Sequence, residues 1–285
     1  MKKIWLVVLL VLSVLTVSGC QAQLDEVDQS VDRAIDQFVE NYVTTYIDED
    51  YPYVVASVYH LDPADKEKIL SENLNPNMLL VRDTANGLIS ALVYESILDI
   101  DMTESRNVLS TKTTENAYEA PSLLHAAYMA NGSVNQINAY IDVIINTDPT
   151  SMDADYAGMA MLALSPYQDQ EDVLEYIEDL KALILRYLSK DGVISWDNAN
   201  SATTATVIIG LVAIGENPRS EVYTVEDIDL IEALLSYENE GGFKWMHAEE
   251  DLDLIFSTPQ AFTALTLYQL FRKGQKPIYL YDFSK

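Results

Sequence analysis

Histidine and cysteine, the side chains that most often bind transition metals or act with a nucleophile, are scarce in this chain. The only cysteine is Cys20, and the three histidines, His60, His125 and His247, lie far apart with no partner at the spacing of a metal ligand. The Gly-x-Ser-x-Gly and His-Glu-x-x-His motifs of hydrolases do not occur. The sequence therefore predicts no metal, no cofactor and no catalytic residue.

Carboxylates are abundant. The 285 residues include 45 Asp and Glu against 17 Lys and Arg, a formal net charge of −28. A field this negative repels phosphate backbones and argues against nucleic-acid binding. Paired carboxylates catalyse glycoside hydrolysis, but in so acidic a chain some carboxylates will meet by chance. The chain also has few Lys and Arg side chains that could bind the carboxylates of acidic sugars. A carbohydrate-active lyase or glycosidase is therefore only the alternative function.

The run from Glu249 to Asp253 is a dense cluster of acids. Ligand sets made only of oxygen suit Ca²⁺. The run lacks the glycine-turned spacing of an EF-hand loop, so we expect a solvated acidic loop rather than a calcium site.

The first nineteen residues have the form of a secretion signal. Two lysines precede an apolar run from Ile4 to Val17, which is shorter than the roughly 20 residues that span a bilayer. The segment ends in Val-Ser-Gly-Cys, which resembles the bacterial lipobox, whose cysteine becomes the lipidated N-terminus. We predict a signal peptide over 1–19, lipidation at Cys20, a tether over 20–26, and a domain over 27–285 anchored at the extracytoplasmic face of the cell membrane.

The elements that follow residue 25 have helical periodicity almost throughout. Amphipathic segments, such as the one with Val31, Ile35 and Phe38 on one face, alternate with segments that are apolar all round and rich in small residues. Six small residues mark the apolar segments at spacings of 35, 36, 36, 47 and 54: Ala56, Ala91, Ala127, Ala163, Gly210 and Ala264. We predict an all-α fold of six helical hairpins, each with an outer amphipathic and an inner buried helix.

Two arrangements of these hairpins are open, a solenoid and a closed ring. An open solenoid usually keeps a strict period and needs polar capping repeats at both ends. Here the spacing drifts upward, and the last inner segments are as apolar as the middle one. We therefore favour a closed α/α toroid with inner and outer helix rings.

Two helix starts carry capping signals. Ser133 with Gln136 three residues later predicts a capping box. Thr224 is predicted to cap a helix that runs through Ile228 and Leu235.

Three stretches of the C-terminal half share a pattern. They are residues 153–167, which begin Asp-Ala-Asp-Tyr-Ala-Gly; residues 191–215, where Asp-Gly-Val-Ile-Ser-Trp precedes an apolar helix; and residues 240–261, where Glu-Gly-Gly-Phe-Lys precedes Ser-Thr-Pro-Gln-Ala. They resemble the blocks of the terpenoid-cyclase and protein-prenyltransferase α/α toroids, whose relatives include surface lipoproteins of Gram-positive bacteria and the cobalamin-carrying intrinsic factor group. The resemblance is good over 150–272 and faint over 50–132.

The resemblance implies the toroid but not the chemistry of those enzymes. The zinc ligands of the prenyltransferases and the Asp-x-Asp-Asp motif of the cyclases are missing here. Asp153 stands where the family usually has an Asp as a helix N-cap, and we expect that role for it.

In toroids of this family, the loops before the inner helices form the rim of a central funnel. The candidate ligand-binding residues at those positions are Tyr118, Asp155, Tyr156, Trp196, Asn198, Asn200, Trp245 and Gln260. Aromatic faces with amides and a few carboxylates suit a ligand such as a glycan, a peptide or a corrinoid. We therefore predict a non-catalytic, ligand- or partner-binding lipoprotein, with a cell-surface carbohydrate-active enzyme as the alternative. The two tryptophans have a second interpretation, in which they only pack their loops against the ring.

Overall fold

A computed structural model of the chain describes residues 25–75, 80–275 and 279–283. These ranges contain twelve α-helices, four short 3-10 helices and five short strands, so the predicted helical fold is confirmed. No helix in these ranges is both long enough and apolar enough to cross a membrane. The predicted signal peptide and Cys20 lie outside the described residues, and the first described helix, α2, begins at Glu26 with Asp25 as its N-cap.

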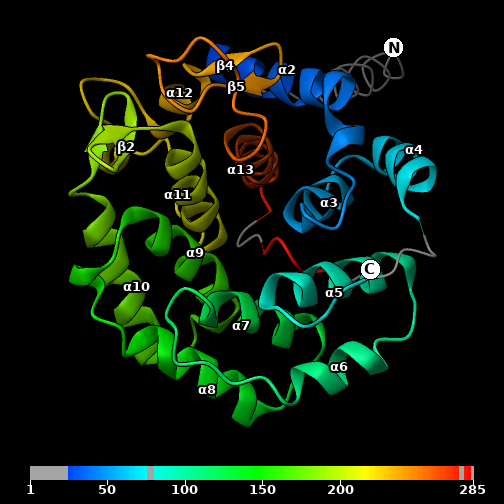
Figure 1. Ribbon diagram of the computed structural model, residues 1–285. Helices are drawn as coiled ribbons and strands as arrows, with labels where there is room; N and C mark the ends of the chain where they lie inside the picture. Colours follow the sequence, from blue (N-terminus) through cyan, green and yellow to red (C-terminus); the bar gives the residue numbers. More distant parts are fainter. Residues whose placement is uncertain (1–24, 76–79, 276–278, 284–285) are drawn as a thin grey trace, which may run out of the picture.

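Six helices form an inner set in which each contacts the next. They are α3 (Pro52–Tyr59), α5 (Ala85–Leu98), α7 (Ala120–Met129), α9 (Ala154–Leu164), α11 (Ser201–Ala213) and α13 (Ser257–Arg272). α13 also contacts α3, so the contacts close into a cycle (Figure 1). All six small residues that mark the apolar segments are buried in these helices. Their short side chains let each inner helix pack closely against its two neighbouring inner helices.

α9 and α11 approach so closely that two positions between them have no room for a side chain. A Cβ built on Gly210 would lie 2.6 Å from the carbonyl oxygen of Gly158 on α9. A Cβ built on Gly158 would overlap the carbonyl oxygen of Thr206 on α11. At these points backbone packs against backbone, which only glycine permits.

Six outer helices alternate with the inner ones along the chain. They are α2 (Glu26–Asn41), α4 (Pro63–Asn73), α6 (Thr103–Leu109), α8 (Val134–Ile145), α10 (Glu171–Ile184) and α12 (Leu230–Leu235). From α4 onward, each packs on the inner helix that precedes it, and α2 packs on α13. The predicted stripe of α2 is confirmed, because Val31, Ile35 and Phe38 are buried while Glu26, Asp36 and Glu40 are exposed. The 3-10 helices are η1 (Val43–Thr45), η2 (Pro149–Ser151), η3 (Ser165–Tyr167) and η4 (Glu221–Tyr223).

Two predicted helix starts need correction. Ser133 caps α8, but the Gln136 side chain donates to the carbonyl of Leu109 at 2.6 Å instead of returning to the cap, so only half of the capping box forms. Thr224 is not a cap, because residues 225–228 form a tight turn in which the amide of Val225 bonds the carbonyl of Ile228. α12 begins later, after a complete capping box of Asp229 and Glu232.

Short antiparallel strands, which the sequence did not reveal, precede α11 and α13. β1 (Leu188–Ser189), β2 (Gly192–Ser195) and β3 (Asn198–Ala199) form one sheet, and β4 (Glu238–Asn239) and β5 (Gly242–Phe243) form another. A buried threonine of the following helix anchors each sheet. The hydroxyl of Thr204 accepts from the amide of Val193, and that of Thr258 accepts from the amide of Phe243, both at 2.9 Å.

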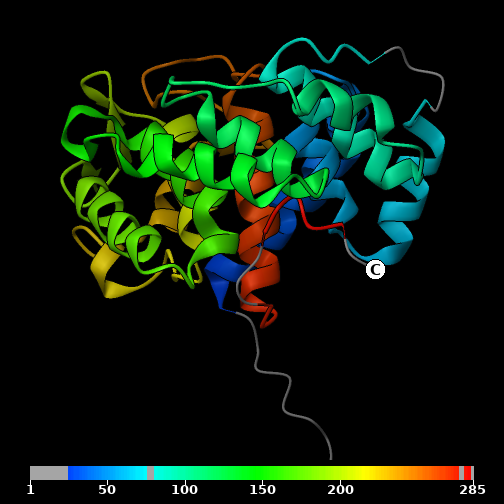
Figure 2. The same cartoon turned by 90° about the horizontal axis from the view of Figure 1, so that it is seen from below.

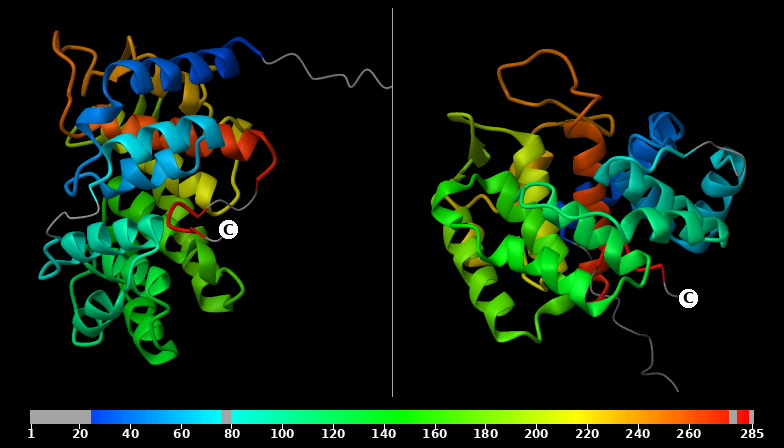
Figure 3. Two further views of the ribbon diagram at one scale, coloured as in Figure 1. Left: turned by 90° about the vertical axis from the view of Figure 1, so that its right-hand side faces the viewer. Right: turned by 60° about the horizontal axis from the view of Figure 1, so that its bottom comes forward.

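Ionic contacts join α2 and α13, the first and last described helices. Arg272 of α13 donates to the carbonyl of Asp28 at 2.9 Å and to the carboxylate of Asp32 at 2.6 Å, both on α2. Arg219, between α11 and α12, donates to the carboxylates of Asp25 and Asp229 at 2.7 Å. α2 therefore starts beside the end of α13, and the two helices lie side by side (Figure 3, left).

Candidate functional site

The inner helices surround a cavity of about 730 Å³. All six contribute, mostly through their first turns, with Pro52 and Tyr53 from α3, Asn86 and Ser90 from α5, Ser122 and His125 from α7, Asp155 and Met159 from α9, Thr206 and Ile209 from α11, and Gln260 and Thr263 from α13. The volume is within the roughly 300–1,000 Å³ range of small-molecule sites. Exposed lining residues, such as Asp50, Asp83 and Asn86, mark its mouth.

The described C-terminal residues, 279–283, form the floor of the cavity. Leu280 and Tyr281 line it, and both are buried. His60, at the end of α3, donates from Nε2 to the carbonyl of Leu280 at 2.8 Å. Nδ1 of His125 lies 2.7 Å from the hydroxyl of Tyr279. These contacts hold the tail in place, and the cavity is therefore closed at the end opposite its mouth.

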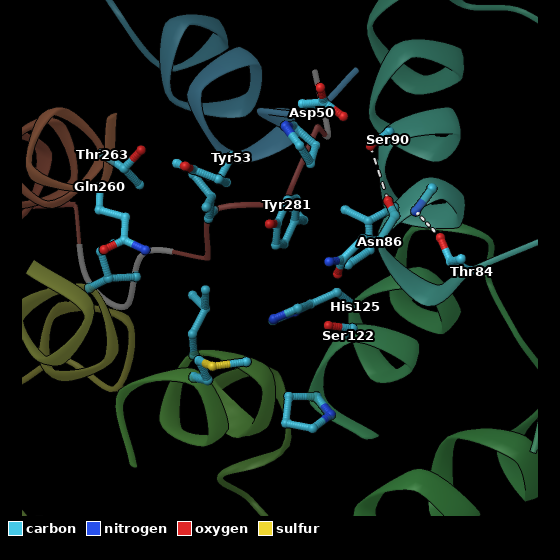
Figure 4. A pocket seen from close by; sticks show the side chains of 18 of the residues that line it. Asp50, Tyr53, Thr84, Asn86, Ser90, Ser122, His125, Gln260, Thr263 and Tyr281 are labelled. Atoms are coloured by element: carbon cyan, nitrogen blue, oxygen red, sulfur yellow. Dashed lines mark hydrogen bonds between the residues drawn. The ribbon is translucent and has the colours of Figure 1, made fainter. Parts of the chain in front are cut away.

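His125 and Tyr281 are the two buried ionisable groups of the cavity wall. The side chain of His125 is 6% exposed and points into the cavity beside Tyr281 (Figure 4). Burial lowers the pKa of His125 to about 3, and burial also raises the pKa of Tyr279 and of Tyr281. The floor is therefore uncharged at neutral pH and presents ring faces together with a neutral imidazole.

Polar groups from several helices converge above this floor. Figure 4 shows Tyr53, Asn86, Ser122 and Gln260 around the same space. The hydroxyl of Ser90, by contrast, is occupied, because it donates to the carbonyls of Glu49 at 2.6 Å and Asn86 at 3.0 Å. The wall thus combines aromatic rings with amides and hydroxyls.

The charges around the cavity are all of one sign. Glu49, Asp50, Asp83 and Asp155 line it, and no Lys or Arg of the described chain does. Burial raises the pKa of the Asp155 carboxyl, and the nearby Asp153 raises it further. The hydroxyls of Thr203 and Ser195 oppose this shift by donating to Oδ2 at 2.9 and 3.2 Å.

A second hollow, of about 670 Å³, adjoins the mouth; we call it the rim groove. It is lined by Asp155, Trp196, Asn200, Ala202, Thr203, Trp245, Glu249, Asp253, Ile255, Phe256 and Gln260. Asp155 and Gln260 belong to both the cavity and the rim groove. The two hollows therefore adjoin each other at these side chains.

Five of the eight predicted ligand-binding residues come together in the rim groove: Asp155, Trp196, Asn200, Trp245 and Gln260. Trp196 is 83% exposed, whereas Trp245 is half-buried. Asn200 is only 2% exposed, and its side chain caps α11 by accepting from the amide of Thr203 at 2.9 Å. Its contribution to the groove is therefore mainly structural.

The other three predicted residues lie outside both hollows. Tyr156 is fully buried, with its hydroxyl 3.4 Å from that of Tyr176 on α10, so it packs the helices and does not face a ligand. Tyr118 is 44% exposed and packs edge-on against Tyr156, with ring centroids 5.3 Å apart. Asn198 is exposed on β3.

The acids at the rim have local partners. Asp153 caps α9 as expected, by accepting from the amide of Tyr156 at 2.8 Å. The carboxylate of Asp253 accepts from the amides of Ile255, Phe256 and Ser257 at the start of α13, and these bonds lower its pKa. Within the described ranges, no group of three or more His, Cys, Asp or Glu residues could hold a metal ion.

Sequence reasoning missed the part of the site that belongs to the N-terminal half and to the tail. Tyr53, Asn86, Ser122, His125 and Tyr281 were not identified. A usable signal existed for His125, which is a polar residue inside an otherwise apolar helix. Comparisons with known protein families, curated proteins and solved structures found no match for this chain.

Proposed function

We propose that this chain is a non-catalytic ligand-binding protein that holds its ligand in the central cavity and rim groove of an α/α toroid. The observation that carries the proposal is the cavity itself, which is open at its mouth, closed at its floor by the tail, and lined from all six inner helices. Two adjoining hollows of this size, with aromatic, amide and carboxylate walls, suit reversible binding.

The toroid is part of the proposal. It is supported by the closed cycle of contacts among the inner helices and by the outer helices that cover them. The contacts of Arg272 with Asp28 and Asp32 join the first and last described helices, as a ring requires. The resemblance of residues 150–272 to toroids of the terpenoid-cyclase and prenyltransferase type points to the same arrangement.

We further propose that Cys20 carries a lipid and anchors the protein at the extracytoplasmic face of the cell membrane. The described fold is compatible with such an anchor. α2 starts beside the end of α13, whereas the rim groove lies at the start of α13, on the opposite side of the molecule (Figure 2). A membrane anchor that leads into α2 would therefore turn the mouth away from the lipid.

A thermal-shift screen of the detergent-solubilised full chain tests the binding function. Glycans, corrinoids, peptides, amines and divalent metals are added one by one, because any ligand of the native state raises the melting temperature. We expect at least one organic ligand to raise it. Asn86→Trp, which places a large ring at the exposed mouth, should abolish the shift.

A matched variant makes the screen specific. Asn107→Trp introduces the same ring at an exposed position of the outer helix α6 and should leave the shift intact. If no compound shifts the melting temperature, or if both variants behave alike, the proposed site is wrong. Turnover of a glycan that Asp155→Asn abolishes would instead support the carbohydrate-active enzyme.

A further inference from the structure

We propose that the cavity and the rim groove together form one site for an elongated organic cation, whose charged group lies beside Asp155 and whose apolar part lies on the rim groove. The inference rests on the proposed binding function and adds to it the chemical class of the ligand. Three features of the described residues support it, namely the sign of the charges, the unpaired acceptors and the exposed apolar side chains.

The charges of the two hollows are exclusively negative. Six acids line them, and no described Lys or Arg does: Glu49, Asp50, Asp83, Asp155, Glu249 and Asp253. Three arginines elsewhere in the fold, Arg82, Arg219 and Arg272, are paired with acids, as Arg82 is with Glu95 at 2.8 Å. An anionic ligand would enter this field without a counter-charge, whereas a cation gains Coulomb attraction from several sides.

Acceptors at the junction of the hollows lack donors. Oε1 of Gln260 is buried and has no hydrogen-bond partner, although a buried acceptor without a donor costs about 1–3 kcal/mol. Both hydroxyls that hold Asp155 donate to Oδ2, and no described side chain donates to Oδ1. An ammonium or guanidinium group carries only donors, so it complements both oxygens.

The apolar part of the ligand has its own surface. Trp196, Ile255 and Phe256 line the rim groove and are 83%, 61% and 61% exposed. Large apolar side chains this exposed in one hollow mark an interaction site more often than a packing role. Because Asp155 and Gln260 also line the groove, one ligand can reach the apolar surface and the acidic cavity together.

The test uses tryptophan fluorescence. The chain has three tryptophans, and one of them, Trp5, is in the predicted signal peptide. In the full chain with Trp5→Phe, the tryptophan fluorescence comes only from Trp196 and Trp245, and both line the rim groove. The probes are the end-blocked tetrapeptide Ala-Phe-Lys-Leu, its analogues with Gln or Glu in place of Lys, and spermidine, a cation without an apolar arm.

We expect the Lys peptide to bind at least tenfold more tightly than the Gln peptide and than spermidine, and the Glu peptide not to bind. Asp155→Asn and, separately, Asp50→Asn should weaken the Lys peptide several-fold. Asp251→Asn, an exposed acid that lines neither hollow, is the control and should change nothing.

Three results would overturn the inference. If the Gln peptide binds as tightly as the Lys peptide, or if neither aspartate variant changes the affinity, the charge has no role. If spermidine binds as tightly as the Lys peptide, the apolar part of the ligand has no role in binding. In each case binding itself survives, so the ligand class fails while the proposed function stands; failure of every compound in the thermal-shift screen would remove both.

Discussion

Helices α9 and α11 meet through glycine, while α3, α5 and α7 on the other side of the inner set present large polar and aromatic side chains to the cavity. Between α9 and α11, Gly158 and Gly210 leave no room for a Cβ. On the opposite side, Tyr53, Asn86 and His125 fill the space between helices only in part. Close backbone packing thus joins α9 and α11, whereas the side chains of α3, α5 and α7 leave part of the space before them empty.

This difference agrees with where the runs of small apolar residues are densest. Residues 150–272, which include α9, α11 and α13, contain these runs. Where backbones touch, only small residues are permitted, so the pattern is constrained and recognisable. Side chains that line a cavity need not interlock with a neighbouring helix, so their types can be suited to the ligand instead.

The largest expected effect tests the tight side. Gly210→Leu inserts four carbons where a Cβ alone would lie 2.6 Å from the Gly158 carbonyl, so we expect a loss of unfolding free energy of about 3 kcal/mol or more. Ser122→Leu on α7, whose side chain faces the cavity, is the matched control and should cost less than about 1 kcal/mol. Urea denaturation of both variants measures the difference, and equal losses would show that the two sides do not differ in packing.

The next effect concerns the ionic contacts between α2 and α13. Arg272→Met leaves the half-buried carboxylate of Asp32 without its cation and removes one of the two arginines beside Asp28, which keeps Arg219 at 3.3 Å. We expect a loss of about 2 kcal/mol, between the values for exposed and buried pairs. Arg186→Met, at an exposed position of the loop after α10, is the control. A loss no greater than that of the control would mean that the ionic contacts do not hold the ends together.

The comparison also indicates what could be predicted. The six small residues and the alternation of helices follow from composition and local spacing, whereas the Asp153 cap was expected from the family resemblance; all three are confirmed. The strands before α11 and α13 are two to four residues long, too short to show a period. The floor depends on contacts such as His125 with Tyr279, 154 residues apart, which no local pattern encodes.

The error at Tyr156 has a simple cause. Asp155 and Tyr156 were both assigned to the rim because both precede an inner helix. In the structure they lie in the first turn of α9, where successive side chains point about 100° apart. Asp155 therefore faces the hollows while Tyr156 points back to Tyr176 on α10. Helical phase, rather than position in a loop, decided which of the two is accessible.

A smaller effect probes the floor of the open side through pH. Because burial lowers the pKa of His125 to about 3, its neutral form is the one that stabilises the fold, and the unfolded chain takes up a proton first, near pH 6.5. This contribution is complete above pH 6.5 and is lost as pH falls toward 3. Between pH 7 and 5.5 we expect it to lower the unfolding free energy by about 1 kcal/mol.

His125→Phe removes this proton and should flatten the pH dependence by that amount, as measured by urea denaturation at both pH values. His247→Phe, at an exposed position, is the control and should keep the wild-type slope. An unchanged slope in His125→Phe would mean that the imidazole is hydrated, and the floor would then not be sealed.

The smallest expected effect on stability distinguishes the two tryptophans of the rim groove. Trp196 is 83% exposed and sits in a left-handed turn with φ 54°, so Trp196→Ala should change the unfolding free energy by less than about 0.5 kcal/mol. Trp245 is half-buried, and its carbonyl accepts from the amide of Ser201 at the start of α11 at 3.0 Å. Trp245→Ala should therefore cost more, about 1 kcal/mol, while both variants weaken binding of the Lys peptide. If Trp196→Ala leaves that affinity unchanged, its exposed ring has no part in the site, and the groove is reduced to the half-buried side next to Asp155.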